Sequence, residues 1–341
     1  MDFYCYNTFE ALQDRKSEWD HLCTLCASDN PFLTFEYQQA WWQTRGGGEW
    51  PESSQLVLVV GFEGDQLIGL APLFHAKNHS GQSVLLFVGA IEVSDFLDFI
   101  AKPGNLPAFI AGLLDFLTTD PALPNWECLD FHNILEDSPS LDLLKSEAER
   151  RGWTHQQIHL QRAPYIPLPD DYDTYLEGLD KKQRHEIRRK QRNIIQSPHT
   201  EAFVFTEDLN TLQADTLSLL ELMAQDPSKK DFLSPAMRQH LRNTAQVAYD
   251  AGWLQLAFLT LDGRKAAANM AFRYKKRLWL YNSGWEWEFR DYSPGWVLLT
   301  QLIKWAIENK ISEFDFMRGD EPYKYKFGAV DRQIFRVTMT P

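Results

Sequence analysis

Hydrophobic and polar positions along the first half of the chain follow an order that predicts an α+β domain. A short strand (DFYCY) precedes a helix over about 8–27 and a second helix carrying FEYQQAWWQT. The strands LVLVVGF and LIGLAPLF follow, and the turn residues Glu63, Gly64 and Asp65 between them predict a hairpin. A third strand (SVLLFVG), a helix through PAFIAGLLDFL, a strand (WECLDFH) and a helix near 138–151 complete this half.

The second half repeats the order of elements. Its strand is AFVFTE, and two helices are expected over about 209–224 and 235–251. A hairpin turning at Asp262 and Gly263, a strand (RLWLYNSGW), a helix (WVLLTQLIKWAIENK) and a strand (EFDFM) follow. The repetition predicts two related α+β domains, 1–165 and 166–341, joined in the proline-rich stretch 163–172.

Composition narrows the class of protein. The 341 residues are 44% hydrophobic and 24% charged, as in ordinary globular proteins, and the net charge of -13 argues against binding to DNA. No signal peptide and no apolar run of about 20 residues is visible, so we expect a cytoplasmic protein; peripheral membrane contact stays open. The motif CTLC lies within an expected helix, which favours buried cysteines, and no metal site is predicted.

The turn before the last long helix is a candidate phosphate site. Pro294 and Gly295 stand at the helix entry, where glycine lets a ligand approach the backbone. The N–H groups of Gly295, Trp296 and Val297, with the helix dipole behind them, would suit a pyrophosphate. The alternative is that Ser293 caps the helix and nothing binds.

The segment 181–192 is positively charged, although the chain as a whole is negatively charged. It contains seven lysine or arginine residues and one acidic residue, Glu186. The seven are Lys181, Lys182, Arg184, Arg188, Arg189, Lys190 and Arg192. Arg184, Arg188 and Arg192 recur every four residues and would form one stripe on a helix. The stripe could bind CoA phosphates, an anionic glycan, lipid head groups or tRNA, or it could be a solvated helix face.

Several motifs together resemble a known family. The chain resembles the CelD/BcsL-type acetyltransferases in five segments. They are YNSGWEWEFRDYSPGWVLL, FDFMRGDEPYKYKFG, DKKQRHEIRRKQRNI, FLTFEYQQAWW and SDFLDFI. That family is a branch of the GNAT superfamily and is related to the FemABX-type aminoacyltransferases. The resemblance implies two tandem GNAT-like domains, each a mixed, mostly antiparallel sheet flanked by helices.

The same resemblance implies an acyl-CoA co-substrate, acetyl-CoA or another acyl-CoA, held by the C-terminal domain between splayed strands. The residues that it assigns to the cofactor are Tyr281, Ser293, Pro294, Gly295, Trp296 and Val297. The chain departs from the superfamily pattern here, because the usual Arg/Gln-x-x-Gly-x-Gly/Ala signature is reduced to Gly295.

The expected chemistry is attack of an amine on a thioester, which needs a base and a proton donor. Asp315 could accept the amine proton, Tyr323 could donate to the thiolate, and Lys324 could bind an acidic group or tune Tyr323. Alternatively, Asp315 pairs with a base such as Arg318, and YKYKF is a period-2 strand whose lysines reach water.

Four further residues are candidates for substrate binding. Asp95 and Asp98 in SDFLDFI could attract a cationic amine into an interdomain cleft, or Asp95 could cap a turn while Asp98 is solvated. Arg184 and Arg188 of the basic stripe are the other two.

The leading hypothesis is an acyl-CoA-dependent N-acyltransferase. Its acceptor would be an amine of a sugar, an amino acid or a cell-envelope or exopolysaccharide precursor. One alternative is FemABX-like transfer from aminoacyl-tRNA, which the basic segment favours and the net charge opposes. The other is a catalytically silent GNAT-fold binding module.

Overall fold

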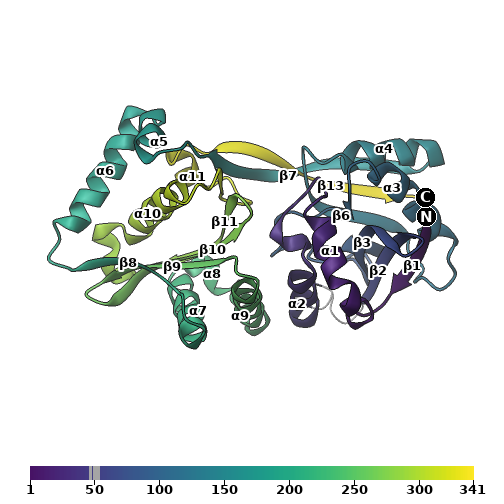
Figure 1. The fold of residues 1–341 in the computed structure, drawn as a ribbon, viewed down its shortest axis with the longest axis horizontal. Coiled ribbons are helices and arrows are strands. Elements are labelled where there is room, and N and C mark those ends of the chain that lie inside the picture. The colour runs from purple at the N-terminus through teal and green to yellow at the C-terminus, as the bar shows by residue number, and fades with distance from the viewer. Residues whose placement is uncertain (46–47, 49–53) are drawn as a thin grey trace. The chain divides into compact units, whose positions relative to one another are not determined.

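The computed structural model describes residues 1–45, 48 and 54–341. The chain divides into two units (Figure 1). Unit 1 is Met1–Gln161 with Arg332–Pro341, and unit 2 is Arg162–Asp331. The C-terminal segment therefore groups with unit 1, whereas the sequence placed it in the domain 166–341. The reason is that strand β13 (Val330–Thr340) pairs antiparallel with β6 (Cys128–Leu135) of unit 1.

The strands of unit 1 form a sheet in the order β1-β2-β3-β4-β6-β13. Its other strands are β1 (Asp2–Tyr6), β2 (Gln55–Glu63), β3 (Gln66–Lys77), β4 (Ser83–Phe87) and β5 (Ile100–Ala101), which pairs with β3. Its helices are η1 (Glu10–Arg15), α1 (Lys16–Cys23), η2 (Pro31–Leu33), α2 (Phe35–Arg45), α3 (Leu106–Thr119) and α4 (Ser140–Arg151). Strands β2 and β3 are buried along nearly their whole length, because helices pack on both faces of the sheet.

Unit 2 repeats this arrangement in the order β7-β12-β11-β10-β9-β8. Its strands are β8 (Glu201–Phe205), β9 (Leu254–Leu261), β10 (Arg264–Tyr274), β11 (Arg277–Trp285), β12 (Glu313–Asp315) and the end of β7 (Thr154–Pro167). Its helices are α5 (Tyr172–Gly178), α6 (Lys181–Ile195), α7 (Leu209–Met223), α8 (Pro227–Lys230), α9 (Pro235–Asp250), η4 (Trp287–Tyr292), α10 (Pro294–Glu308) and α11 (Pro322–Lys326). Helices α7 and α9 lie on one face of the sheet and α10 on the other (Figure 1).

The two units share one topological feature. In unit 1, β4 pairs parallel with β6 after the connecting helix α3; in unit 2, β11 pairs parallel with β12 after α10. The remaining pairs of strands with known register in each unit are antiparallel. The sheets are therefore mixed and mostly antiparallel, and the predicted α+β class is confirmed.

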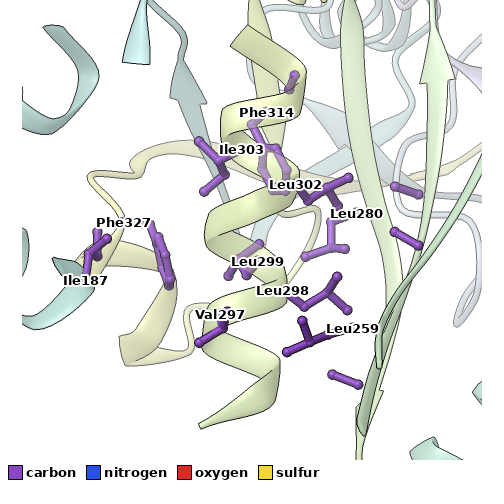
Figure 2. Close-up of a cluster of buried hydrophobic side chains, with 14 of the residues drawn as sticks. Ile187, Leu259, Leu280, Val297, Leu298, Leu299, Leu302, Ile303, Phe314 and Phe327 are labelled. Atoms are coloured by element: carbon purple, nitrogen blue, oxygen red, sulfur yellow. The ribbon is translucent and has the colours of Figure 1, made fainter. Parts of the chain in front are cut away.

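Helix α10 fixes the core of unit 2 (Figure 2). Leu298 and Leu302 face Leu259 and Leu280 of the sheet, as an amphipathic helix requires. Each such buried side chain contributes about 1.5–3 kcal/mol of hydrophobic stabilisation. The N-terminus of α10 is thereby held at the edge of the sheet, beside β11.

Two local predictions were wrong. The stretch 163–172 begins as strand rather than linker, since β7 continues to Pro167 and pairs with β12. The run YKYKF is helix α11, with Pro322 at its first turn, and not a period-2 strand. The Asp262–Gly263 hairpin is confirmed, and both residues adopt the positive φ that such a turn needs.

Candidate active site

Strand β11 leaves part of one edge uncovered. Its pairing with β12 spans only Arg277–Trp279, whereas its pairing with β10 continues to Trp285. The register with β10 shifts between Met270 and Ala271, so the strand carries an irregularity at Tyr281. No described strand pairs with residues 280–285 on the β12 side. A cavity of about 660 Å³ lies there, bounded by α8, α11 and the start of α10.

The start of α10 presents backbone donors to this cavity. Ser293 has a left-handed backbone (φ 51°) and its side chain caps no N–H, so the expected side-chain cap is not formed. Its carbonyl oxygen accepts from the N–H of Val297 at 3.1 Å, which removes Val297 from the predicted donors. Gly295 and Trp296 line the cavity, and their N–H groups meet no acceptor among the described residues. This pair suits an anion at a helix N-terminus.

Gly295 leaves space that the protein itself does not fill. A Cβ added there would meet only Trp285, at 3.6 Å or more. Pro294 and Ser293 line the same cavity, as predicted, while Val297 points away from it and lines a different one. Four of the six predicted cofactor residues are therefore brought together: Ser293, Pro294, Gly295 and Trp296.

Tyr281 is not among the lining residues. Its hydroxyl lies 3.3 Å from Nε2 of His240 on α9, and its ring lies tilted against that of Phe272, with the centroids 4.8 Å apart. The irregularity in β11 accounts for this, because it changes the side of the strand on which neighbouring residues fall. Tyr281 therefore lies outside the candidate cofactor site.

Asn269 is a lining residue that sequence reasoning missed. It stands on β10 opposite Ser283 of β11 and is 3% exposed. Its amide nitrogen Nδ2 is buried without a partner in the described protein. A buried donor without an acceptor is costly unless a ligand supplies one. The signal was present in AAANMAF, where a single amide interrupts an apolar strand.

Lys229 of α8 is a second residue that the sequence did not reveal. Its Nζ donates to the carbonyl oxygen of Ser283 at 2.7 Å, on the uncovered edge of β11. Burial lowers the pKa of the Lys229 ammonium. The cavity also holds Asp226 and Glu321, whose carboxylates could attract a cationic group.

Tyr323 of α11 lines the cavity, as a donor to the leaving thiolate would have to. Burial raises the pKa of its phenol above the ordinary value, and the Glu321 carboxylate adds to the shift. The hydroxyl thus stays protonated at neutral pH and remains able to donate.

Lys324 and Asp315 lie outside the lining of the cavity. Lys324 is 3% exposed, and its Nζ donates to the carbonyl oxygens of Arg318 (2.7 Å) and Gly319 (2.8 Å). Asp315 is fully buried, and its Oδ1 accepts from the N–H of Met317 at 2.6 Å. Both side chains hold the turn between β12 and α11, so a structural role accounts for them.

Asp95 and Asp98 belong to unit 1. Asp98 is 2% exposed and accepts hydrogen bonds from Ser28, Ser138 (2.5 Å) and Ser140 (2.5 Å). Burial raises its pKa, although the serine hydroxyls oppose the shift. Asp98 is therefore a structural carboxyl and not the solvated or amine-binding group that the sequence suggested. Asp95 is half-buried in the same loop, and its contact with an acceptor stays a prediction.

The basic segment forms helix α6, as predicted, with Asp180 as its N-cap. Arg184 donates to the carbonyl oxygens of Leu176 (3.4 Å) and Glu177 (3.2 Å) and so caps the end of α5. Arg188 lines a different cavity from Tyr323 and Gly295. Neither arginine reaches the lining of the candidate active site.

The described residues contain no group of three or more His, Cys, Asp or Glu placed to hold a metal ion. Cys23 and Cys26 are buried, and burial raises the pKa of the Cys26 thiol to about 12. None of the helices in the described ranges is long and apolar enough to cross a membrane.

Most residues that line the cavity beside β11 fall within a part of the chain that matches a known protein family. Residues 181–325 match the family model of the acetyltransferase (GNAT) domain. No curated protein matches the chain in sequence. The crystal structure of FemX superposes with a TM-score of 0.66 at 11% identity, covering 98% of this chain and 97% of FemX.

Two further structures are similar over the chain. A conserved protein of unknown function from Bacteroides thetaiotaomicron VPI-5482 has a TM-score of 0.63 at 11% identity, with 100% of both chains covered. L-PGS from Bacillus licheniformis has a TM-score of 0.52 at 12% identity, covering 92% of this chain and 93% of that one. At these identities the likeness concerns the fold. The expected GNAT-like fold is confirmed, and residues 181–325 are similar in sequence to the acetyltransferase (GNAT) domain family.

Proposed function

We propose that the chain is an acyl-CoA-dependent N-acyltransferase whose reaction takes place in the cavity beside β11. The observation that carries this proposal is the juxtaposition of Gly295 and Trp296 N–H groups with the uncovered edge of β11. A GNAT domain over the same residues supports it. Acyl-CoA would supply an activated thioester when bound, and CoA would leave as the thiol.

The residues present fit such a ligand. The two helix N–H groups would bind the pyrophosphate, and the buried Asn269 amide would donate to a carbonyl oxygen of the pantetheine or acyl part. Tyr323 would hold its proton at its Oη for the leaving thiolate. Arg290, at the exposed side of the lining, would approach a phosphate.

The proposed acceptor is a primary amine. Asp226 and Glu321, the latter paired with Lys324 at 2.9 Å, place two carboxylates in the cavity wall that would hold an ammonium, which gives its proton to solvent before the amine attacks the thioester. Amines of sugars, amino acids or cell-envelope or exopolysaccharide precursors have this chemistry. Such an acceptor agrees with the resemblance to the CelD/BcsL-type enzymes.

Calorimetric titration with acetyl-CoA tests the proposal. We expect binding to the wild-type chain and at least about tenfold weaker binding to Gly295→Glu, whose carboxylate would oppose the pyrophosphate. Gly295→Ala is the matched control, because a Cβ there has room. Absence of any binding heat for the wild type at millimolar acetyl-CoA would contradict the proposal.

An assay of thiol release then separates the hypotheses that remain. Amine-dependent release of CoA supports the acyltransferase. Binding of acetyl-CoA without release for any amine supports a silent binding module. Aminoacyl transfer from aminoacyl-tRNA, without acetyl-CoA binding, supports FemABX-like activity, for which the FemX-like fold is the motivating observation.

A further inference from the structure

A second cavity, of about 350 Å³, lies in unit 2 between α6, α10 and the beginnings of α5 and β8. It shares no lining residue with the cavity beside β11. The side chains that matter to its chemistry are Tyr172, Arg188, Gln191, Arg192, Glu201 and Lys304. Its size falls within the range of small-molecule sites.

Three cationic side chains line this cavity. Arg188 and Arg192 stand one turn apart on α6 and are both exposed, and neither guanidinium forms an ion pair or hydrogen bond with the described residues. Arg189 on the same helix is different, because its Nη2 lies 2.9 Å from Oε1 of Glu186. Lys304 adds a third positive charge from α10, weakly paired with Glu308 at 3.7 Å. Guanidinium groups bind phosphate well, so two arginines and a lysine that line one cavity would suit a phosphate.

The lining of this cavity also includes a hydrogen-bond acceptor that has no donor among the described residues. Oε2 of Glu201 is buried and has no hydrogen-bond partner among the described residues. Burial alone raises the pKa of this carboxyl, and no cation offsets the effect. A ligand hydroxyl would satisfy it. The Tyr172 hydroxyl is also buried here, and its pKa is raised to about 12, so it remains a donor.

We propose that this cavity binds a small sugar phosphate. Arg188, Arg192 and Lys304 would hold the phosphate, and Glu201 would accept a hydrogen bond from a sugar hydroxyl. The site is separate from the acyl-CoA cavity and does not depend on the proposed acyltransferase function.

Calorimetric titration with glucose 6-phosphate, inorganic phosphate and glucose tests the site. We expect glucose 6-phosphate to bind, inorganic phosphate to bind about tenfold more weakly, and glucose not to bind. The double variant R188Q/R192Q should lose both phosphate ligands. R189Q, which removes a charge from the same helix outside the cavity, should bind as the wild type does.

Glu201→Leu provides a second, independent variant. It should lower the affinity for glucose 6-phosphate to that for inorganic phosphate, while inorganic phosphate binds as before. Gly295→Glu should leave sugar phosphate binding intact, so that this site and the acyl-CoA cavity are tested separately.

Four results would overturn the proposal. The first is no binding of glucose 6-phosphate at millimolar concentration, and the second is a loss of its binding in R189Q equal to that in R188Q/R192Q. The third is competition between glucose 6-phosphate and acetyl-CoA. The fourth is binding of tRNA, but of no phosphate ligand, that R188Q/R192Q abolishes. The last result would assign the arginines to nucleic acid.

Discussion

Gly284 of β11 lies directly against the main chain of Met223 at the end of α7: a Cβ at Gly284 would stand 2.4 Å from the Met223 nitrogen. Backbone cannot yield as a flexible side chain can. We therefore expect Gly284→Ala to lower the free energy of unfolding by about 1–3 kcal/mol through overpacking. Urea unfolding measures this change.

Gly295→Ala is the control for this substitution, since its Cβ would meet Trp285 at ordinary contact distance. It should change the stability by no more than about 0.5 kcal/mol. Equal stability losses in the two variants would show that close approach is not what requires glycine at 284.

The order of elements in both units could be predicted because hydrophobic period and turn residues are local signals. The helix α10 and the donors at its start followed from Pro294 and Gly295. Strand β13 gave no such signal, since what holds it is pairing with β6, which lies about 200 residues away in the chain.

The cavity residues show the same division. Gly295 and Tyr323 stand in motifs that a sequence displays. Asn269 and Lys229 reach the cavity from other elements, and only the fold brings them to Ser283. Asp98 was misjudged because three serines distant in the chain surround it, a burial that the local sequence SDFLDFI does not encode.

Lys324 offers a test of a structural against a catalytic role. Lys324→Met removes the hydrogen bonds to the carbonyl oxygens of Arg318 and Gly319, and it also removes the ion pair with Glu321 at 2.9 Å. We expect a loss of about 1–3 kcal/mol in unfolding free energy. Lys326→Met, on the exposed side of α11, is the control. A stable Lys324→Met protein with strongly reduced kcat would instead restore the catalytic hypothesis.

Asp98 makes the stability of unit 1 depend on pH. Because burial raises its folded-state pKa above 3.8, the folded state holds the proton more tightly than the unfolded state. The contribution of the protonated Asp98 carboxyl to the free energy of unfolding is complete below pH 3.8. It is lost as pH rises through the folded-state pKa. Asp98→Asn stays neutral, so its stability relative to wild type should increase between about pH 4 and about pH 8, by about 1.4 kcal/mol for each unit of pKa difference.

Urea unfolding of both proteins at the two pH values measures this difference. Asp142→Asn on the exposed side of α4 is the control for loss of a carboxylate. A constant stability difference between Asp98→Asn and wild type would show that Asp98 is ionised in the folded protein throughout this range.

Tyr323 is the residue through which the proposed reaction is tested most directly. Tyr323→Phe keeps the ring and removes the hydroxyl that lines the cavity, so kcat for acyl transfer should fall by about 100-fold while KM for acetyl-CoA changes little. Tyr325→Phe is the matched control, because its hydroxyl binds Asp331 and lies outside that cavity. If kcat falls equally in both variants, the effect comes from disturbing α11, and Tyr323 does not donate to the thiolate.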